Sequence, residues 1–380
     1  MSDDKKSNKV DKGIQIINTT DLINLLNDGY NDYDSSDSDS DSNTDSNNVN
    51  YNEWEYKEIN KEVNSIDDLI ELGNKYNPDE KVRYNIDLLT LNKLIKPLEK
   101  LKSMIGLNSV KQNIADQIIY NLQKLDSSTD EMMHTVIQGS PGVGKTMLGQ
   151  ILGEIYFNMG IIKGNNKRNY HGEQKYEFKI VKRSDLIGKY LGHTAAKTQK
   201  VIDSCRGGVL FIDEAYSLGN SEGRDSFSKE CIDTLNQNLT ENKGNLLCII
   251  AGYKDALEKC FFAYNEGLSR RFTFRYTIEP YSKEELRLIF IKMVKDIGWS
   301  IEDKDIPIHF FEKNYDHFKN MAGDIETLIF NVKIEHSKRV FCKPELRKKL
   351  NYEDIKKGFK KFCDNKNENE KNNIWKDMFI

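Results

Sequence analysis

The sequence has few of the features that mark secreted or membrane proteins. Its 380 residues include only 6 cysteines, and no two of them form a C-x-x-C pair. No apolar run approaches the roughly 18 residues that a membrane-spanning helix needs. The opening residues, MSDDKKSNKVDKG, contain no apolar signal core. We therefore expect a soluble, intracellular protein of the cytoplasm, with no membrane partner and with reduced cysteines.

The sequence also has no excess of basic residues over acidic ones. The formal net charge is −4, with 38% hydrophobic and 31% charged residues. A nucleic-acid-binding domain should be clearly basic, so nucleic acid is not an expected partner. The histidines show no metal-ligand spacing with one another or with the cysteines. The histidines and cysteines therefore predict no metal site.

Composition and periodicity divide the chain into segments. Residues 31–50, NDYDSSDSDSDSNTDSNNVN, hold almost no apolar groups, so they cannot bury enough surface to offset the entropy of ordering. Ser65 followed by Asp68 resembles a helix capping box. The predicted segments are a disordered acidic N-terminal tail (1–50), a helical extension (51–99), an α/β domain (100–277), an all-helical lid (278–363) and a C-terminal tail (364–380).

Strands and helices alternate in the α/β segment. The runs HTVIQ, YEFKIV, GGVLFID and LLCIIAG read as buried strands, and apolar residues at helical spacing lie between them. This alternation predicts a parallel sheet with helices on both faces. After Pro280 the strand pattern stops, and Ser282 with Glu285 forms a capping box ahead of a helical region.

A phosphate-binding motif follows the first predicted strand. The eight residues GSPGVGKT match G-x-x-x-x-G-K-[ST] in full, and they lead into the predicted helix MLGQILGEIY. This context is the one that the motif requires, because the loop and the helix N-terminus then present N–H groups to phosphate. We expect Lys145 to reach the β- and γ-phosphates and Thr146 to bind magnesium. The predicted nucleotide-binding residues are Gly139, Ser140, Pro141, Gly142, Val143, Gly144, Lys145 and Thr146.

Two acids end the third predicted strand. Asp213 and Glu214 follow the apolar run GGVLFI, and open α/β sheets bind ligands at the carboxyl edge of their strands. We expect Asp213 to hold Mg²⁺ and Glu214 to activate a water for attack on ATP. Solvated acids at the end of an ordinary strand are the alternative, which the nearby phosphate motif disfavours.

Longer motifs resemble a known family. The stretches SDLIGKYLGHTAAKTQKVIDSCRGGVLFIDEAYSL and IIAGYKDALEKCFFAYNEGLSRRF are similar to the CbbX/CfxQ branch of the AAA+ ATPases, the red-type Rubisco activases, over about residues 100–345. The asparagine-rich composition and acidic insert resemble giant-virus members, for which host cytoplasm or the virion is the expected location. The resemblance implies a P-loop AAA+ sheet, a helical lid and a ring of six copies.

The resemblance also assigns roles to residues outside the phosphate motif. It implies that Ile105 and Gly106 line the adenine pocket and that Arg271 is an arginine finger for the neighbouring subunit, a role otherwise open to Arg270. Two departures stand out. Gly252-Tyr253 occupies the place of a polar sensor, as in this branch. The lid reads GDIE, residues 323–326, where the family usually has Gly-Asn-x-Arg, so an acid replaces a phosphate-binding arginine. We expect either slower hydrolysis or a different response of the lid to nucleotide.

The segment IGKYLGHT raises a separate question, because glycines flank an aromatic residue in a stretch that suits neither helix nor strand. Tyr190 is either an anchor folded onto the core or a group presented outward. By resemblance, Tyr190, Leu191 and Gly192 form a pore loop that grips an extended peptide.

Three functions compete at this point. The first is an ATPase that remodels an unidentified protein client by threading it through a homohexameric ring. The second is a nucleic-acid motor or loader built on the same module. The third is an ATP-binding scaffold in which Glu326, in place of the arginine, has ended turnover.

Overall fold

The structure is a computed structural model that describes residues 54–123, 132–168, 174–190, 192–219, 225–301 and 306–377. The chain divides into two units, residues 1–53 and 54–380, and the description concerns the second unit alone. The predicted acidic tail, residues 1–50, and Leu191 of the predicted pore loop lie outside the described residues.

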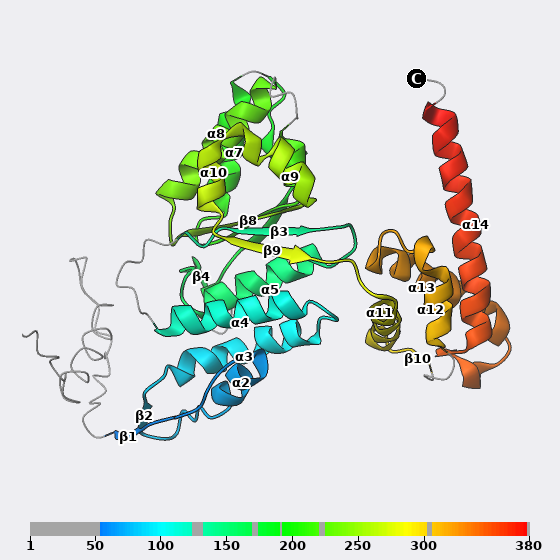
Figure 1. Ribbon diagram of the computed structural model, residues 1–380, viewed down its shortest axis with the longest axis horizontal. Coiled ribbons are helices and arrows are strands. Elements are labelled where there is room, and N and C mark those ends of the chain that lie inside the picture. The colour runs from blue at the N-terminus through cyan, green and yellow to red at the C-terminus, as the bar shows by residue number, and fades with distance from the viewer. Residues whose placement is uncertain are drawn as a thin grey trace, which may run out of the picture. The chain divides into compact units, whose positions relative to one another are not determined.

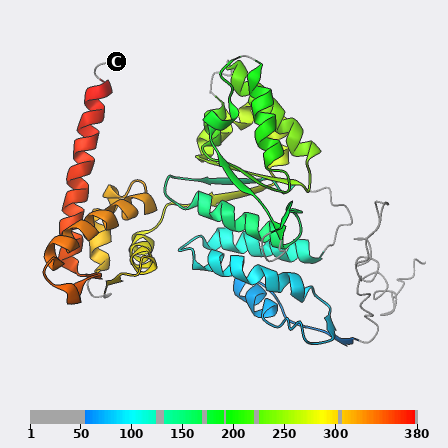
Figure 2. The same cartoon turned by 180° about the vertical axis from the view of Figure 1, so that it is seen from behind.

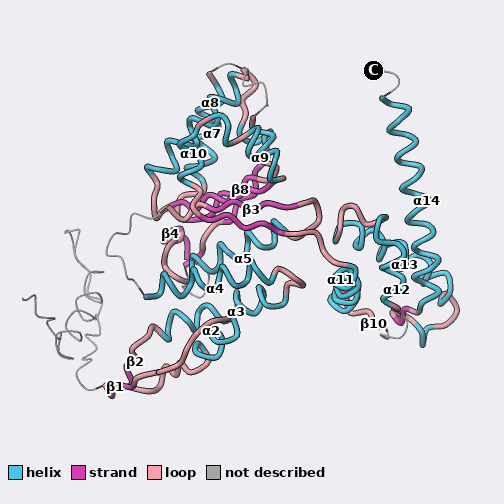
Figure 3. Tube along the Cα trace, in the orientation of Figure 1, coloured by secondary structure: helices cyan, strands magenta, loops and turns pink. Residues whose placement is uncertain are grey.

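A five-stranded sheet forms the centre of the α/β region (Figure 3). All neighbouring strands are parallel, and their order is β6-β7-β8-β3-β9. The first four predicted strands are confirmed, whereas the fifth, β9, was not predicted. The strands are β3 (Thr135–Gly139), β6 (Phe178–Val181), β7 (Gly208–Ile212), β8 (Leu246–Gly252) and β9 (Phe274–Ile278).

The sheet is buried on both faces, which explains the continuous apolar runs of its strands. Successive residues belong to two different hydrophobic clusters. Ile137 and Ile249 belong to one cluster, whereas Val136 and Cys248 belong to the other. Because side chains alternate across a strand, each strand contributes to both clusters and needs helices on both sides.

Helices cover both faces of the sheet (Figures 1 and 2). On one face lie α4 (Asn108–Gln123) and α5 (Lys145–Asn158). On the other face lie α7 (His193–Ser204), α8 (Ser226–Glu241), α9 (Lys254–Cys260) and α10 (Glu266–Arg271). Shorter elements connect them: α6 (Arg183–Leu186), the 3₁₀ helices Ala215–Leu218 and Phe262–Tyr264, and the two-stranded pair β4 (Asn165–Arg168) and β5 (Gln174–Lys175).

Residues 54–103 pack beside this region as an extension. It holds α2 (Ile66–Gly73) and α3 (Leu88–Ser103), together with a parallel pair of strands, β1 (Glu55–Lys57) and β2 (Val82–Tyr84). The segment predicted as helical therefore also contains two short strands. The capping prediction is confirmed, because the Ser65 side chain accepts a hydrogen bond from the backbone N–H of Asp68.

The lid follows β9. Its helices are α11 (Lys283–Asp296), α12 (Ile308–Asn314), α13 (Ala322–Val340) and α14 (Tyr352–Asp377), with the strand pair β10 (Ser300–Ile301) and β11 (Lys349–Leu350) and the 3₁₀ helices Tyr315–His317 and Pro344–Leu346. The capping box of α11 is confirmed: the Ser282 N–H donates to Glu285 Oε2 at 2.7 Å, and the Glu285 N–H donates to Ser282 Oγ at 3.1 Å.

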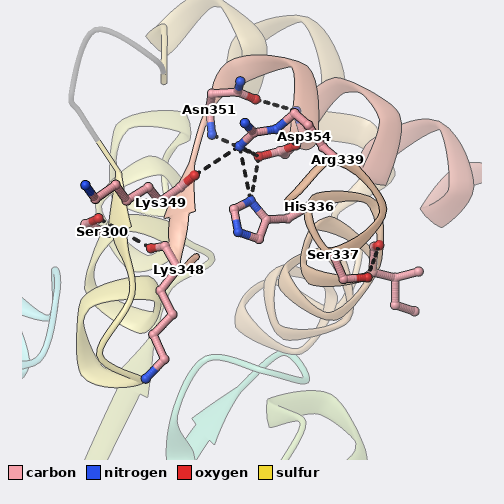
Figure 4. Close-up of polar contacts among 9 residues, drawn as sticks. Ser300, His336, Ser337, Arg339, Lys348, Lys349, Asn351 and Asp354 are labelled. Carbon is pink, nitrogen blue, oxygen red and sulfur yellow. Dashed lines mark hydrogen bonds and ion pairs between the residues drawn. The ribbon is translucent and has the colours of Figure 1, made fainter. Parts of the chain in front are cut away.

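A buried polar cluster joins α13 to the start of α14 (Figure 4). Arg339 Nε donates to Asp354 Oδ1 at 2.8 Å, and His336 Nδ1 lies 3.0 Å from Asp354 Oδ2. Burial alone would raise the pKa of Asp354, but hydrogen bonds from Arg339 and His336 outweigh it and hold this pKa below its usual value. From this joint α14 continues through the predicted tail, residues 364–380, as far as Asp377.

Candidate nucleotide site

The phosphate motif forms the turn between β3 and α5. Gly139 is the last residue of β3, and Lys145 is the first of α5. Gly142 and Gly144 have φ angles of 70° and 88°, in the left-handed region that residues with a Cβ rarely adopt. The turn therefore depends on glycine at both positions, and it brings the loop's backbone N–H groups to the start of a helix, where anions bind.

Lys145 holds its ammonium group within this turn. Its Nζ donates to the carbonyl oxygens of Gly139 at 3.0 Å and Ser140 at 2.7 Å. Burial lowers the pKa of Lys145, while the charges of Asp213 and Glu214 oppose that shift. Because β3 and β7 are parallel strands of one sheet, the loop that holds Lys145 and the two acids lie at the same edge of that sheet.

The two acids follow β7 directly. The Asp213 N–H donates to Val181 O at 3.0 Å, so the pairing with β6 continues one residue beyond β7. Asp213 is half-buried and Glu214 is exposed. Glu214 has a φ of 52°, and its N–H donates to Asp213 Oδ1 at 3.1 Å. A non-glycine residue in this conformation costs about 1–3 kcal/mol, and such strain clusters at functional sites.

Two tyrosines beside these acids complete the sheet edge. Tyr253 follows β8, and its ring centroid lies 5.7 Å from that of Tyr216. A Cβ added to Gly252 would lie 2.9 Å from the Tyr216 ring, so glycine lets this ring pack against the end of the strand. Burial, followed by the charge of Glu214, raises the pKa of Tyr216. Sequence reasoning missed Tyr216, although its place two residues after Glu214 was a usable signal.

The chemistry of this site fits a magnesium nucleotide. The Ser140 Oγ is buried and has no hydrogen-bond partner among the described residues. Thr146 supplies a hydroxyl and Asp213 a carboxylate, both oxygen donors of the kind that Mg²⁺ prefers. When bound, a magnesium nucleotide would supply a phosphoric anhydride at this edge of the sheet. The residues that would hold it are those of the loop, Lys145, Thr146 and Asp213.

The predicted adenine segment lies between α3 and α4. Ile105 is half-buried, and Gly106 has a φ of 69°. Two lysines hold the residues just before it: Lys111 Nζ donates to Met104 O at 2.6 Å, and Lys292 Nζ, from α11 of the lid, donates to Ser103 O at 2.5 Å. The segment therefore has contacts to both the α/β region and the lid, as a nucleotide pocket between them requires.

The lid reaches the phosphate loop at two points. Tyr281 Oη donates to Val143 O at 2.9 Å, and the Ala322 N–H donates to Gly142 O at 3.1 Å. Ala322 begins α13, the helix that carries the GDIE residues. Asp324 is buried, whereas Glu326 is exposed. The acid that replaces the family's arginine is therefore on the solvent side of α13.

Tyr190 lies between α6 and α7 with 68% of its surface exposed. Its ring meets His193 edge to face, with the centroids 5.6 Å apart. The base of the segment is fixed, because Lys197 Nζ donates to the carbonyls of Ser184 and Ile187. Gly192 directly precedes α7. The exposure of Tyr190 favours a presented side chain over an anchor that is folded onto the core.

Arg271 ends α10 and contacts its own chain. Its Nε donates to Thr240 Oγ1 at 2.8 Å, and one terminal nitrogen donates to Gly267 O at 2.7 Å. Arg270 beside it is exposed. The role of Arg271 as a finger for a neighbouring subunit stays a prediction, and it would require the guanidinium group to leave Thr240.

The fold and this site together define the class. A parallel sheet with a phosphate loop after β3, paired acids after β7 on the far side of β8, and a helical lid on the loop describes a P-loop ATPase of the AAA+ type. The family model for AAA, the ATPase family associated with various cellular activities, matches residues 135–279.

Relatives narrow the class further. The chain is 46% identical over 315 residues to a cfxQ-like protein of Acanthamoeba polyphaga mimivirus, covering 82% of this chain and 75% of that one. It is 32% identical to a CfxQ homolog of Cyanidium caldarium, over 64% of this chain and 84% of that one. It is 33% identical to a chloroplastic ribulose bisphosphate carboxylase/oxygenase activase of Cyanidioschyzon merolae, over 70% and 86%. The chain belongs to the CbbX/CfxQ family of AAA+ ATPases.

Family membership supports nucleotide binding. No helix in the described part of the chain is both long and apolar enough to cross a bilayer.

Proposed function

We propose that the protein hydrolyses ATP with magnesium and uses the resulting subunit motion to remodel a protein client through a ring of six copies. The observation that carries the proposal is that the phosphate loop after β3, which holds Lys145, and the acids after β7, Asp213 and Glu214, lie at the same edge of one parallel sheet. A phosphate cradle and a pair of acids at one edge are what hydrolysis of a nucleotide requires.

Each residue has a distinct part in the proposed reaction. The loop N–H groups and Lys145 bind and orient the phosphates, which accounts for much of the catalysis in phosphoryl transfer. Thr146 and Asp213 hold magnesium. Glu214, exposed at the end of its strand, takes the proton of the attacking water. General-base catalysis of this kind is worth about 10²–10⁴ in rate.

Remodelling rests on Tyr190. An exposed aromatic side chain on a loop with a fixed base can contact an extended peptide without reading its sequence, because apolar contact is not directional. The relative named as a ribulose bisphosphate carboxylase/oxygenase activase indicates the class of client, a folded protein, that we propose for this chain.

Phosphate release and nucleotide retention test the proposal. Wild type should release phosphate from magnesium ATP. Glu214→Gln should retain ATP but lose at least about 10²-fold in turnover, and Lys145→Ala should lose ATP binding. Glu279→Gln is the matched control, because Glu279 is an exposed acid just after β9, on the same sheet edge. Equal phosphate release by wild type and Glu214→Gln would instead indicate a nucleotide-binding scaffold.

The remodelling step needs a separate measurement. A permanently unfolded polypeptide should stimulate wild-type turnover more than duplex DNA does. Tyr190→Ala should keep basal turnover and lose the stimulation. Stimulation by DNA alone would favour a nucleic-acid motor.

A further inference from the structure

The turn that precedes α13 is one of two parts of the lid that contact the phosphate loop. Besides the hydrogen bond from the Ala322 N–H to Gly142 O, a Cβ on Gly142 would overlap the carbonyl oxygen of Asn320. Residues 320–323 therefore pack directly on the loop backbone. Any shift of this turn changes the surroundings of the phosphate site.

This turn is strained and needs support. Met321 has φ 46° and ψ −117°, a conformation that residues other than glycine rarely adopt. Such a conformation persists only where its surroundings determine it. Part of the support comes from Asp324, whose carboxylate accepts the Asn320 N–H at 2.8 Å.

The remaining support comes from the C-terminal helix. Lys366, on α14, donates from Nζ to Asp324 Oδ2 at 2.9 Å and to His317 O at 2.7 Å. The same ammonium lies 5.1 Å from the Phe362 ring centroid. The Lys366 ammonium therefore contacts both ends of the segment 317–324, at His317 and at Asp324. The strained Met321 lies between these two contacts in the sequence.

The charge of Asp324 gives this pair a consequence for function. The Asp324 side chain is only 9% exposed, and it is close in sequence to the residues that touch the phosphate loop. An unneutralised buried carboxylate there would repel a triphosphate, because charges interact strongly where water is excluded.

We propose that Lys366 is a positioning residue of the nucleotide site: it neutralises Asp324 and holds the turn at residues 320–323 against the phosphate loop. The proposal rests on the nucleotide function proposed above. It makes α14 part of the nucleotide-binding machinery and not a tail.

Titration of the full chain with magnesium ATP tests the proposal, which predicts an asymmetry: loss of Lys366 should weaken binding, whereas loss of the charge on Asp324 should not. Lys366→Met leaves a buried acid unpaired, so the Kd for ATP should rise about tenfold, within the usual range of coupling between sites. Asp324→Asn removes the acid and keeps an acceptor for the Asn320 N–H, so the Kd should stay the same or fall. The double variant Asp324→Asn/Lys366→Met should bind within about threefold of wild type, because neither charge remains.

Lys338→Met is the matched control, since Lys338 pairs with Glu335 on α13 but 65% of its side chain is exposed. It should leave the Kd unchanged. A purely structural ion pair would make both single variants weaken binding alike, and that result, or an unchanged Kd for Lys366→Met, overturns the proposal. If Lys366→Met does not fold, Asp324→Asn and the double variant decide, because a structural role predicts that both bind weakly.

The wild-type titration separates this proposal from the proposed function. Failure of the wild type to bind ATP would refute the nucleotide function itself. Binding by the wild type without the asymmetry would refute only the role of Lys366.

Discussion

The Lys145 ammonium lies 5.8 Å from the centroid of the Tyr253 ring. A cation over a tyrosine face gains about 0.5–1 kcal/mol at a partly exposed site. Lys145 also donates to the carbonyl oxygens of the loop. The Tyr253 ring therefore adds to the contacts that position the ammonium group proposed to bind the phosphates.

Removing this ring should loosen nucleotide binding. We expect Tyr253→Ala to raise the Kd for magnesium ATP about two- to fivefold, which corresponds to the loss of the cation–π interaction. Tyr253→Phe keeps the ring and should bind like wild type. Calorimetric titration of both variants checks the prediction, and equal Kd values for the two would show that the ring does not support Lys145.

We expect Gly142 to be indispensable for a reason that Gly160, another glycine with a left-handed backbone, does not share. Gly142→Ala adds the cost of a left-handed backbone, about 1–2 kcal/mol, and displaces the Asn320 carbonyl of the lid. Gly160→Ala is the control, because its φ of 75° is similar but nothing lies within 4 Å of the added Cβ.

Gly160→Ala should lose about 1–2 kcal/mol in the free energy of unfolding measured with denaturant, and Gly142→Ala should lose at least as much. Only Gly142→Ala should also weaken ATP binding, by more than about tenfold, because the lid turn must move. Equal ATP affinity in the two alanine variants would show that the lid contact is dispensable for binding.

Local sequence patterns predict the parts of the site that depend on neighbouring residues. The phosphate loop, the acids after β7 and the capping box at Ser282 each depend on a few successive residues, and the structure has all three. The fifth strand was missed because FRYTI alternates apolar and polar residues at the edge of the sheet, and within this strand only Tyr276 and Ile278 are buried. Such a short pattern is weaker than a continuous apolar run.

Contacts between distant segments could not be read from the sequence. Residues 364–377 are rich in Asn, Lys and Glu, a composition that resembles a solvated tail, yet they continue α14. The contact of Lys366 with Asp324 depends on how two lid helices pack together. No periodicity in either helix indicates that pairing.

His134 should make stability depend on pH. It is buried at the start of β3; its Nδ1 accepts the Cys248 N–H at 3.1 Å, and Nε2 lies 3.1 Å from Leu239 O. Burial lowers its pKa to about 4 from 6.5. The unfolded chain therefore binds the proton more tightly than the folded chain does. The stability that neutral His134 contributes to the fold is complete above pH 6.5 and is lost as the pH falls from 6.5 to 4.

The loss should be up to about 1.4 kcal/mol per pH unit in that interval. Denaturant unfolding at several pH values measures it. His134→Gln should be less stable at pH 7 but show a shallower pH dependence, whereas His309→Gln, at an exposed histidine, should follow wild type. A wild-type slope that His134→Gln does not reduce would assign the pH dependence to other groups.

Arg271 gives a prediction that depends on assembly. Arg271→Ala should lower turnover by about 10³-fold or more if the side chain completes a neighbour's site, whereas Arg270→Ala should stay near wild type.

Loss of the hydrogen bonds from Arg271 to Thr240 and Gly267 within its own chain would lower turnover as well, so the decisive measurement mixes subunits of two variants. Arg271→Ala subunits keep an intact site, and Glu214→Gln subunits keep an intact Arg271. Where the two stand side by side in a ring, one site regains all of its groups, so the mixture should hydrolyse ATP faster than the sum of its parts. A mixture that only adds the two residual activities would place the effect of Arg271 inside its own subunit.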